Sequence, residues 1–543
     1  MPLLHVTYAG QDHHVEFGTT VEAWADAVTA AVLVNGRLAS LKTPLTADAR
    51  VEPVTLRDRL GHRVYRRTLA LLLELARRRT EGLPALVLGP SWGGGHAFDT
   101  HDGLPIDTAL LEALRHNLLT LVESDLPLVP VRLPFSAAIA ALNHPDDEDA
   151  RVFLTQKNPS EVLLIRCGDT LAWSPDPVLA STGRASVWRL EAGPTGLVLG
   201  FPAKTWPLVA APWVPSKAVA RAHADDRAWG RIQGVTTAVR LNALAGQPAR
   251  IEAFIQGAEA VHERRIAALA DAVVGRGARI VLVAGPSSAG KTTFAKRLAV
   301  QLQACGRQPL AVSLDDYFVD REQTPRDTEG RYDYESLDAL DRQRLAADLE
   351  TLLADGSAQL PVYDFKTGRR RAEGRPYRLG GDGILILEGI HGLNRDLWPA
   401  RPEGQCFTIF VSALTSLTRE GRSRISTSDH RLIRRLVRDR QFRGYSALQT
   451  LRQWASVRRG EDSHLFPYQD GADGIFNSAL PYEFSVLREG AVPLLETVSP
   501  EEPEYAQARF LRSFLNGFIP IPARFVPPFS LLREFLGQSG FHY

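Results

Sequence analysis

One short segment of this chain restricts its possible folds more than any other. The apolar run from Ile280 to Ala284 leads directly into Gly285-Pro286-Ser287-Ser288-Ala289-Gly290-Lys291-Thr292-Thr293, and a helical pattern follows from Phe294 to Gln303. A buried strand, a glycine-rich loop ending in Gly-Lys-Thr and a helix together predict a phosphate-binding loop (P-loop) within a parallel α/β sheet.

Each position of this loop has an expected role. Lys291 reaches the β and γ phosphates of a nucleotide, and Thr292 is a ligand of Mg²⁺. Because lysine occurs only seven times in the chain, we do not expect Lys291 to match the P-loop motif by chance. We therefore expect ATP and Mg²⁺ as cofactors, with the nucleotide bound by Gly285, Ser287, Ser288, Ala289, Gly290, Lys291, Thr292 and Thr293.

A second apolar strand pattern, from Leu310 to Leu314, ends in Asp315-Asp316. The carboxyl ends of parallel strands open on the same crevice, so a carboxylate here faces the transferring phosphate. Such an acid can take the proton of an attacking hydroxyl, which predicts Asp315 as a catalytic base. The alternative is that Asp315 or Asp316 only caps the next turn.

Four ordered motifs extend the argument beyond the P-loop. They are Ser313-Leu314-Asp315-Asp316-Tyr317-Phe318, Tyr332-Asp333, Pro361-Val362-Tyr363-Asp364-Phe365 and Leu387-Glu388-Gly389-Ile390. With the P-loop, they make residues 275 to 490 resemble the uridine kinase and phosphoribulokinase group of P-loop kinases.

The resemblance implies roles for several side chains. Asp315 falls on the family's catalytic base, Asp333 and Tyr363 on its contacts to the sugar and base of the acceptor, and Glu388 on the acid that organises Mg²⁺. The alternatives are purely structural roles: a core aromatic for Tyr363, a turn residue for Asp333 and a helix cap for Glu388. Where uridine kinases place a base-reading His, this chain has Gly368, so uridine is not assured as the substrate. Arg369-Arg370-Arg371 could face an anionic acceptor or form a solvated turn.

Arginines gather between His430 and Gly444. Arg431, Arg434, Arg435 and Arg438 share one helical face by their spacing. The family uses such a helix as a lid over the transferring phosphate, which implies catalytic roles for Arg434 and Arg438 and a substrate contact for Arg443. The alternative is a solvated face paired with Asp439.

The first sixty residues predict a small mixed sheet around one helix. Strands are expected at Leu4–Tyr8 and His14–Phe17, a helix from Thr20 to Ala30, and a hairpin at Asn35-Gly36. The order resembles the TGS domain, a β-grasp module at the front of threonyl-tRNA synthetases.

Residues 61–215 are expected to form an α+β domain, with helices from Val64 and from Asp107 to Val122. The stretch from Cys167 to Leu190 resembles the second domain of threonyl-tRNA synthetase, but that family's Cys, His and H-x-x-x-H metal ligands are missing, so tRNA editing is not expected. A metal site or, in preference, a solvated loop is expected at His96, Asp99, His101 and Asp102.

The remaining segments predict a helical connector at 216–274, the kinase domain at 275–495 and a C-terminal arm at 496–543. The arm contains a helix from Tyr505 to Leu515 and Ser530 capping Leu531 to Leu536. It is expected to dock on another domain, with a partner-binding peptide as the alternative.

Composition sets the outer limits. A chain of 543 residues is too long for one domain. Its 63 basic and 62 acidic side chains nearly cancel, so no overall positive charge attracts nucleic acid. Three cysteines, far apart in the sequence, favour the reducing environment of the cytoplasm. The fold class is therefore multidomain α/β and α+β. We expect a nucleoside kinase acting on a small molecule, without a membrane and with the oligomeric state open. A sugar-phosphate kinase, or a nucleotide switch on an RNA-binding front half, remains the alternative.

Overall fold

The computed structural model describes residues 3–92, 94–100, 103–193, 195–203, 209–210, 216–327, 330–364, 367–421 and 423–542. At the N-terminus, five strands form one sheet in the order β2-β1-β5-β3-β4, in which only β1 and β5 are parallel. The strands are β1 (Leu3–Tyr8), β2 (Gln11–Glu16), β3 (Thr29–Val34), β4 (Arg37–Ala39) and β5 (Ala49–Thr55). The predicted hairpin is present, with Asn35 at φ +48° and Gly36 at φ +73°.

The helix expected from Thr20 to Ala30 is wrong. A single 3₁₀ turn, Val21–Trp24, takes its place, and β3 already begins at Thr29. The Asp26 carboxylate accepts hydrogen bonds from the backbone N–H of Thr29 at 2.9 Å and from its hydroxyl at 2.5 Å. A short acidic side chain that bonds to nearby backbone competes with helix formation, and the β-branched residues that follow favour a strand.

The next region combines two antiparallel sheets with four helices. One sheet has the order β11-β12-β7-β6 and the other β10-β9-β8. The strands are β6 (Leu86–Trp92), β7 (Gly95–Thr100), β8 (Leu128–Pro134), β9 (Glu161–Cys167), β10 (Thr170–Trp173), β11 (Arg189–Gly193) and β12 (Gly196–Gly200), and the helices are α1 (Arg59–Arg78), α2 (Thr108–Glu123), α3 (Phe135–Ala141) and α4 (Glu148–Lys157).

The solvated loop expected at residues 96–102 is also wrong where the structure describes it. His96 and Asp99 lie in β7, which pairs with β6 and β12 on either side. The buried Asp99 forms an ion pair with Arg227 and accepts a hydrogen bond from the Thr195 hydroxyl at 2.6 Å. His101 and Asp102 lie outside the described residues. Within the described ranges, no group of three or more His, Cys, Asp or Glu could hold a metal ion.

Three helices lead to the parallel sheet: α5 (Lys217–Ile232), α6 (Ala238–Ala245) and α7 (Pro248–Gly275). The sheet has the order β14-β19-β13-β20-β21 with every neighbouring pair parallel. Its strands are β13 (Ile280–Ala284), β14 (Gln308–Ser313), β19 (Gly383–Glu388), β20 (Cys406–Ser412) and β21 (Gly474–Asn477).

The central strand β13 is buried along its whole length because apolar layers cover both faces of the sheet. Val281 and Val283 face a core that includes residues of α7 and α8 (Lys291–Ala304), whereas Ile280 and Leu282 face a second core that includes residues of α9 (Arg342–Asp355). This arrangement explains the unbroken apolar run in the sequence. The remaining short strands are β15 (Ser357–Leu360), β16 (Tyr363–Asp364), β17 (Arg369–Arg370) and β18 (Arg375–Arg378).

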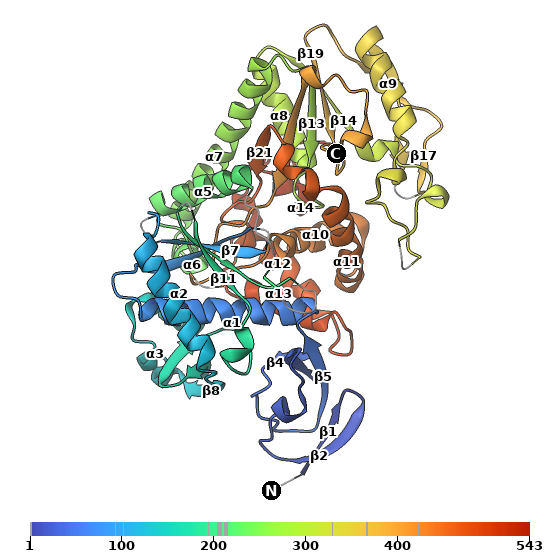
Figure 1. Ribbon diagram of the computed structural model, residues 1–543. Coiled ribbons are helices and arrows are strands. Elements are labelled where there is room, and N and C mark those ends of the chain that lie inside the picture. The colour runs from blue at the N-terminus through green and yellow to red at the C-terminus, as the bar shows by residue number, and fades with distance from the viewer. Residues whose placement is uncertain are drawn as a thin grey trace.

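The C-terminal part wraps back over the sheet. It contains α10 (Thr427–Arg443), α11 (Ala447–His464), α12 (Glu483–Glu496), α13 (Tyr505–Leu515) and α14 (Arg533–Leu536). The helix predicted from Tyr505 to Leu515 is confirmed. The prediction that Ser530 caps a helix from Leu531 is wrong, because α14 begins at Arg533 with Leu532 as its N-cap residue, and the Ser530 hydroxyl instead accepts a hydrogen bond from the Leu532 N–H in the preceding turn. Figure 1 shows the chain's C-terminal end beside the parallel sheet, and α1 between that part and the N-terminal strands.

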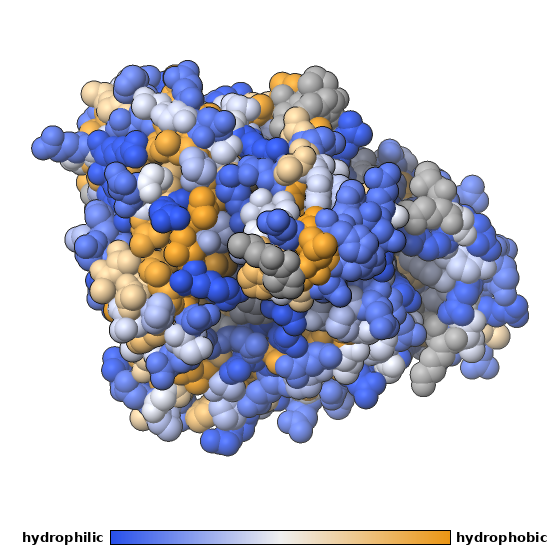
Figure 2. Space-filling view, turned by 90° about the horizontal axis from the view of Figure 1, so that it is seen from below, coloured by the Kyte–Doolittle hydropathy of each residue, from blue (hydrophilic) through white to orange (hydrophobic). Residues whose placement is uncertain are grey.

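The surface seen from the N-terminal end is mainly hydrophilic, with apolar side chains in smaller groups (Figure 2). None of the helices in the described part of the chain has the length and apolar character needed to span a membrane.

Candidate active site

The phosphate-binding loop joins β13 to α8, and the local geometry requires glycine at both of its glycine positions. A Cβ atom at Gly285 would lie 2.2 Å from the carbonyl oxygen of Val411. Gly290 has φ +87°, and a Cβ there would lie 2.5 Å from the Leu531 side chain of the C-terminal arm. The loop leads into the N-terminus of α8, where the backbone N–H groups of the first helical turn favour a negatively charged group.

Three arginines of α10 donate hydrogen bonds to this loop. Arg431 donates a hydrogen bond to the Ser287 carbonyl at 2.8 Å, and Arg435 donates to the Ser287 hydroxyl at 2.9 Å. Arg434 donates to the carbonyls of Ser288 and Ala289, both at 3.4 Å. The predicted arginine face therefore lies against the loop.

The innermost arginines are neutralised by fully buried carboxylates. Arg431 forms two hydrogen bonds to Glu461, at 2.5 and 2.7 Å, and Arg434 forms two to Glu483, at 2.6 and 3.0 Å. All four side chains are inaccessible to solvent. Removing one member of such a pair leaves a buried charge without its partner, so these pairs fix the position of the loop.

The outer arginines lie differently. Arg438 and Arg443 pair with Asp439 at 2.9 and 3.6 Å and keep 16% and 46% of their side-chain surface exposed. Both also act electrostatically on Asp315. Of the five arginines predicted for the lid, these two combine exposure with proximity to the predicted base.

Two carboxylates that the sequence did not reveal bind backbone N–H groups of the loop. Glu461 accepts a hydrogen bond from the Ser287 N–H at 2.8 Å. Glu534, from α14, accepts from the Thr293 N–H at 3.1 Å and from its hydroxyl at 2.6 Å. Because loop amides are the expected phosphate donors, Glu534 occupies a position that an anionic ligand would also seek.

The predicted magnesium ligands lie together at the carboxyl end of β19. The Thr292 hydroxyl donates a hydrogen bond to Glu388 Oε1 at 3.0 Å, and the Ser313 hydroxyl donates to the same oxygen at 3.3 Å. Burial raises the pKa of Glu388 to about 7, although the nearby Lys291 ammonium lowers it. A hydroxyl and a carboxylate at this distance form an oxygen donor set suited to Mg²⁺.

Asp315, the predicted base, lies in the 3₁₀ turn Leu314–Tyr317 that follows β14. Burial raises the pKa of its carboxyl group, against the lowering effect of Lys291, Arg443 and Arg438. Asp316, by contrast, accepts a hydrogen bond from the Tyr363 N–H at 3.1 Å, so it anchors β16. The two neighbouring carboxylates thus have different surroundings.

Glu335 is a third acid of the site that sequence reasoning missed. Burial, followed by the charge of Glu461, raises its pKa to about 7 despite the lowering effect of Arg435 and Lys291. A Cβ atom at Gly460 would lie 2.2 Å from the Glu335 Cβ, so this glycine lets the 335 segment approach α11. The only sequence clue was its place two residues after Asp333.

The predicted acceptor residues lie on the adjacent segments. Tyr363 is 6% exposed and its ring packs edge-on against Phe318 at 5.6 Å between centroids. The Asp333 carboxylate accepts a hydrogen bond from the Glu335 N–H at 3.1 Å within its own turn. These surroundings also agree with the structural alternatives, a core aromatic for Tyr363 and a turn residue for Asp333.

Gly368 is in the left-handed region, at φ +72°, and a Cβ there would lie 2.6 Å from Arg321 Nε. A guanidinium therefore occupies the space toward which a side chain at position 368 would point. Substitution of this glycine by His would strain the backbone and displace Arg321.

The comparisons with known proteins concern this part of the chain first. Residues 280–400 match the family model described as "Phosphoribulokinase / Uridine kinase family". A uridine kinase of Chloroflexus aurantiacus is 31% identical over 204 residues, which are 36% of this chain and 85% of that protein. A solved structure, "Structure of a Possible Uridine Kinase from Bacillus stearothermophilus", overlaps 39% of this chain and 97% of its own, at 20% identity and a TM-score of 0.27.

A different relative is the threonine–tRNA ligase of Desulforamulus reducens. It is 29% identical over 160 residues, which are 29% of this chain and 25% of that protein. The uridine kinases are matched over most of their length and the ligase over a quarter of its own. By this extended match and by its P-loop site, the chain belongs to the phosphoribulokinase/uridine kinase family of ATP-dependent phosphotransferases.

Proposed function

We propose that this protein transfers the γ-phosphoryl group of ATP to a hydroxyl group of a nucleoside. The loop from Gly285 to Thr293 binds the phosphates, with Lys291 on the β and γ groups. Thr292 and Glu388 hold Mg²⁺, which when bound neutralises charge on the phosphates.

The proposed reaction needs no covalent enzyme intermediate. Asp315 accepts the proton of the acceptor hydroxyl, the hydroxyl oxygen forms a bond to the γ phosphorus, and the bond between that phosphorus and ADP breaks. Arg438 and Arg443 stabilise the charge on the transferring group. Arg434 acts by holding the loop, because its guanidinium is already paired with Glu483.

One observation supports this proposal more than any other. Asp315 follows β14 at the carboxyl edge of the sheet, and the cations that act on its pKa are Lys291 of the P-loop, Arg443 and Arg438. A base with a raised pKa beside three cations is suited to proton transfer near neutral pH.

A second acceptor class is favoured by Arg321. Its guanidinium lies where the family's base-reading histidine would point, next to the basic stretch Arg369-Arg370-Arg371. A guanidinium binds a phosphate group better than the edge of an uncharged base. A sugar phosphate is therefore the alternative acceptor.

The test is a panel of nucleosides and sugar phosphates, assayed by coupled ADP release. One nucleoside should raise ADP release well above the rate without acceptor, and Asp315→Asn should abolish the increase. A sugar phosphate as the sole effective acceptor would select the alternative. ADP release that responds only to RNA would contradict both and favour a nucleotide switch on an RNA-binding front half.

For the front half, we infer common origin with threonyl-tRNA synthetase domains. The proposed division is a TGS-like unit at 1–60, a synthetase-like unit at 61–215 and a connector at 216–274, followed by the kinase at 275–495 and the arm at 496–543. The ligase match supports this in part. Expression of 1–215 as a separate, cooperatively unfolding fragment would test the boundary.

A further inference from the structure

A second cavity lies away from the P-loop, where the front half meets the kinase part. It has a volume of about 540 Å³ and is lined by residues of α1, β6, β7, α11 and α13, by residues 173–176, and by residues of the stretches 419–421 and 423–429 around the start of α10. None of the P-loop residues lines it. A volume of this size is typical of sites that hold a small organic molecule.

Positively charged side chains outnumber negatively charged ones in the lining of this cavity. Seven of the lining residues are arginines and five are carboxylates. Most arginines have a partner: Arg59 and Arg63 pair with Asp429 at 2.5 and 2.9 Å, and Arg67 pairs with Asp176 at 3.0 Å. Two further lining pairs are Arg419 with Glu420 at 3.0 Å and Arg458 with Asp462 at 2.8 Å. The fifth carboxylate, Glu74, faces Arg77 and Arg78 outside the lining.

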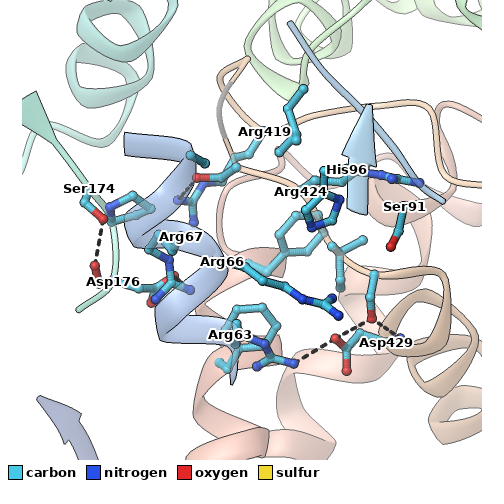
Figure 3. A pocket seen from close by; sticks show the side chains of 18 of the residues that line it. Arg63, Arg66, Arg67, Ser91, His96, Ser174, Asp176, Arg419, Arg424 and Asp429 are labelled. Atoms are coloured by element: carbon cyan, nitrogen blue, oxygen red, sulfur yellow. Dashed lines mark hydrogen bonds and ion pairs between the residues drawn. The ribbon is translucent and has the colours of Figure 1, made fainter. Parts of the chain in front are cut away.

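Two arginines have no carboxylate partner in the described part of the chain. The Arg66 guanidinium lies over the Phe201 ring, 4.0 Å from its centroid, and its buried Nε has no hydrogen-bond acceptor there. Arg424 donates to the carbonyls of Gly89 at 2.8 Å and Thr415 at 2.6 Å, and its buried Nε also lacks an acceptor. Figure 3 shows Arg66 extending from α1 toward the side of the cavity where Arg424 and His96 lie.

His96 adds to this positive cluster. Its buried Nδ1 has no hydrogen-bond partner among the described residues. Burial, and then Arg66, Arg424 and His62, hold the pKa of His96 well below its usual value. The neutral ring can donate one N–H to a ligand without adding charge.

Uncompensated guanidinium groups in an enclosed space cost free energy unless an anion neutralises them. The forked donors of arginine match a phosphate group best, and here they come from two separate parts of the chain. Apolar side chains, among them Phe98, Phe510 and Phe514, also line the cavity and suit the organic body of a ligand. We propose that this cavity binds a small organic phosphate, whose phosphate group is held by Arg66 and Arg424 with His96 beside them.

The experiment measures binding of adenosine 5′-monophosphate to the full chain by calorimetry, in saturating Mg²⁺ and ADP so that the P-loop is occupied. Adenosine and inorganic phosphate are the comparison ligands. We expect the monophosphate to bind at least tenfold more tightly than either of them. Equal affinity for inorganic phosphate would refute the proposal that the ligand has an organic part.

Variants locate the site. Arg66→Gln should weaken binding of the monophosphate by at least tenfold, and Arg66→Lys, which keeps the charge but loses the fork, should weaken it less. The matched control is Arg57→Gln, because Arg57 is exposed and lies just before α1. Undiminished binding by a folded Arg66→Gln protein would overturn the proposal.

Thermal unfolding separates a binding role from a structural one. Because Arg66 lacks a carboxylate partner, Arg66→Gln should keep or raise the ligand-free Tm while losing the rise that the monophosphate causes. A lower Tm with an unchanged ligand-induced rise would mean that Arg66 only supports the fold. Should Arg66→Gln fail to fold, Arg424→Gln carries the same two measurements, and retained binding there would overturn the proposal.

Discussion

Replacing Arg434 with Met would separate the arginines that support the P-loop from those that act on phosphate. Arg434 is fully buried, and besides Glu483 it bonds to the Ser478 carbonyl at 2.7 Å. Met has a similar length and no charge. Among the described residues, the buried Glu483 would then keep two partners, His430 at 2.8 Å and the Leu480 N–H at 2.9 Å.

The structure gives the size of the effect. Burial by itself raises the pKa of Glu483, but Arg434, followed by His430, lowers it from 4.5 to about 2. A shift of that size corresponds to about 3 kcal/mol of folding free energy. Breaking a buried ion pair by removing one partner costs about 3–5 kcal/mol, which agrees. Because the folded pKa is lowered, this stability is complete above pH 4.5 and is lost as the pH falls toward 2.

The assay is thermal unfolding at pH 7 together with steady-state turnover. For a domain of about 200 residues, a loss of about 3 kcal/mol lowers Tm by about 6–12 °C. Arg438→Met is the matched control: Asp439 keeps Arg435 and Arg443 as partners, so Tm should change little. Its kcat should fall by about 10²–10³-fold if Arg438 stabilises the transferring phosphoryl group. An unchanged Tm in Arg434→Met, with a kcat loss equal to that of Arg438→Met, would refute this division of roles.

Three further predictions concern the acids around the P-loop. Asp315→Asn should lower kcat by about two to four orders of magnitude with little change in nucleotide binding, whereas Asp316→Asn should retain most activity; exchanged phenotypes in the coupled assay would contradict the assigned base. Glu534→Gln removes a negative charge from the Thr293 N–H, so the KM for ATP should fall, and an unchanged or higher KM would speak against competition with phosphate. Because the pKa of Glu335 is raised to about 7, the stability of the protein should decrease as pH rises from 4.5 to 7, and Glu335→Gln should flatten that dependence in Tm measurements.

The sequence predicted those parts of the site that are contiguous in the chain. Strand, loop and helix around Lys291 follow one another directly, so the local pattern contains both the motif and its structural context. Asp315 was accessible for a similar reason, because a strand and its last residues fix which edge of a parallel sheet a side chain reaches.

The missed residues reach the site through tertiary structure. Glu461 and Glu534 are 174 and 241 residues away from the backbone N–H groups that they bind. No sequence periodicity links such distant positions. In the sequence, each glutamate looks like an ordinary surface residue of its own helix. The arginine helix illustrates the same limit: its spacing predicted a shared face, but the division into buried and exposed arginines depends on Glu461 and Glu483, which lie outside that helix.

Local pattern also failed where one side chain changed the backbone. The alanines near residues 23–31 favour a helix by intrinsic propensity, yet the Asp26 carboxylate bonds to the N–H groups that a helix would use, and the buried strand β3 takes up the rest. The strand burial of Thr29, Ala30 and Ala31 outweighs a propensity difference of under about 1 kcal/mol per residue.

The helix α10 connects the cavity and the phosphate-binding loop. Its first turn carries Asp429, which pairs with Arg59 and Arg63 of α1 and accepts a hydrogen bond from Gln507 of α13 at 2.8 Å. Two residues later, Arg431 donates to the Ser287 carbonyl of the loop. The same helix therefore contacts α1 and α13 through Asp429 and the phosphate-binding loop through Arg431.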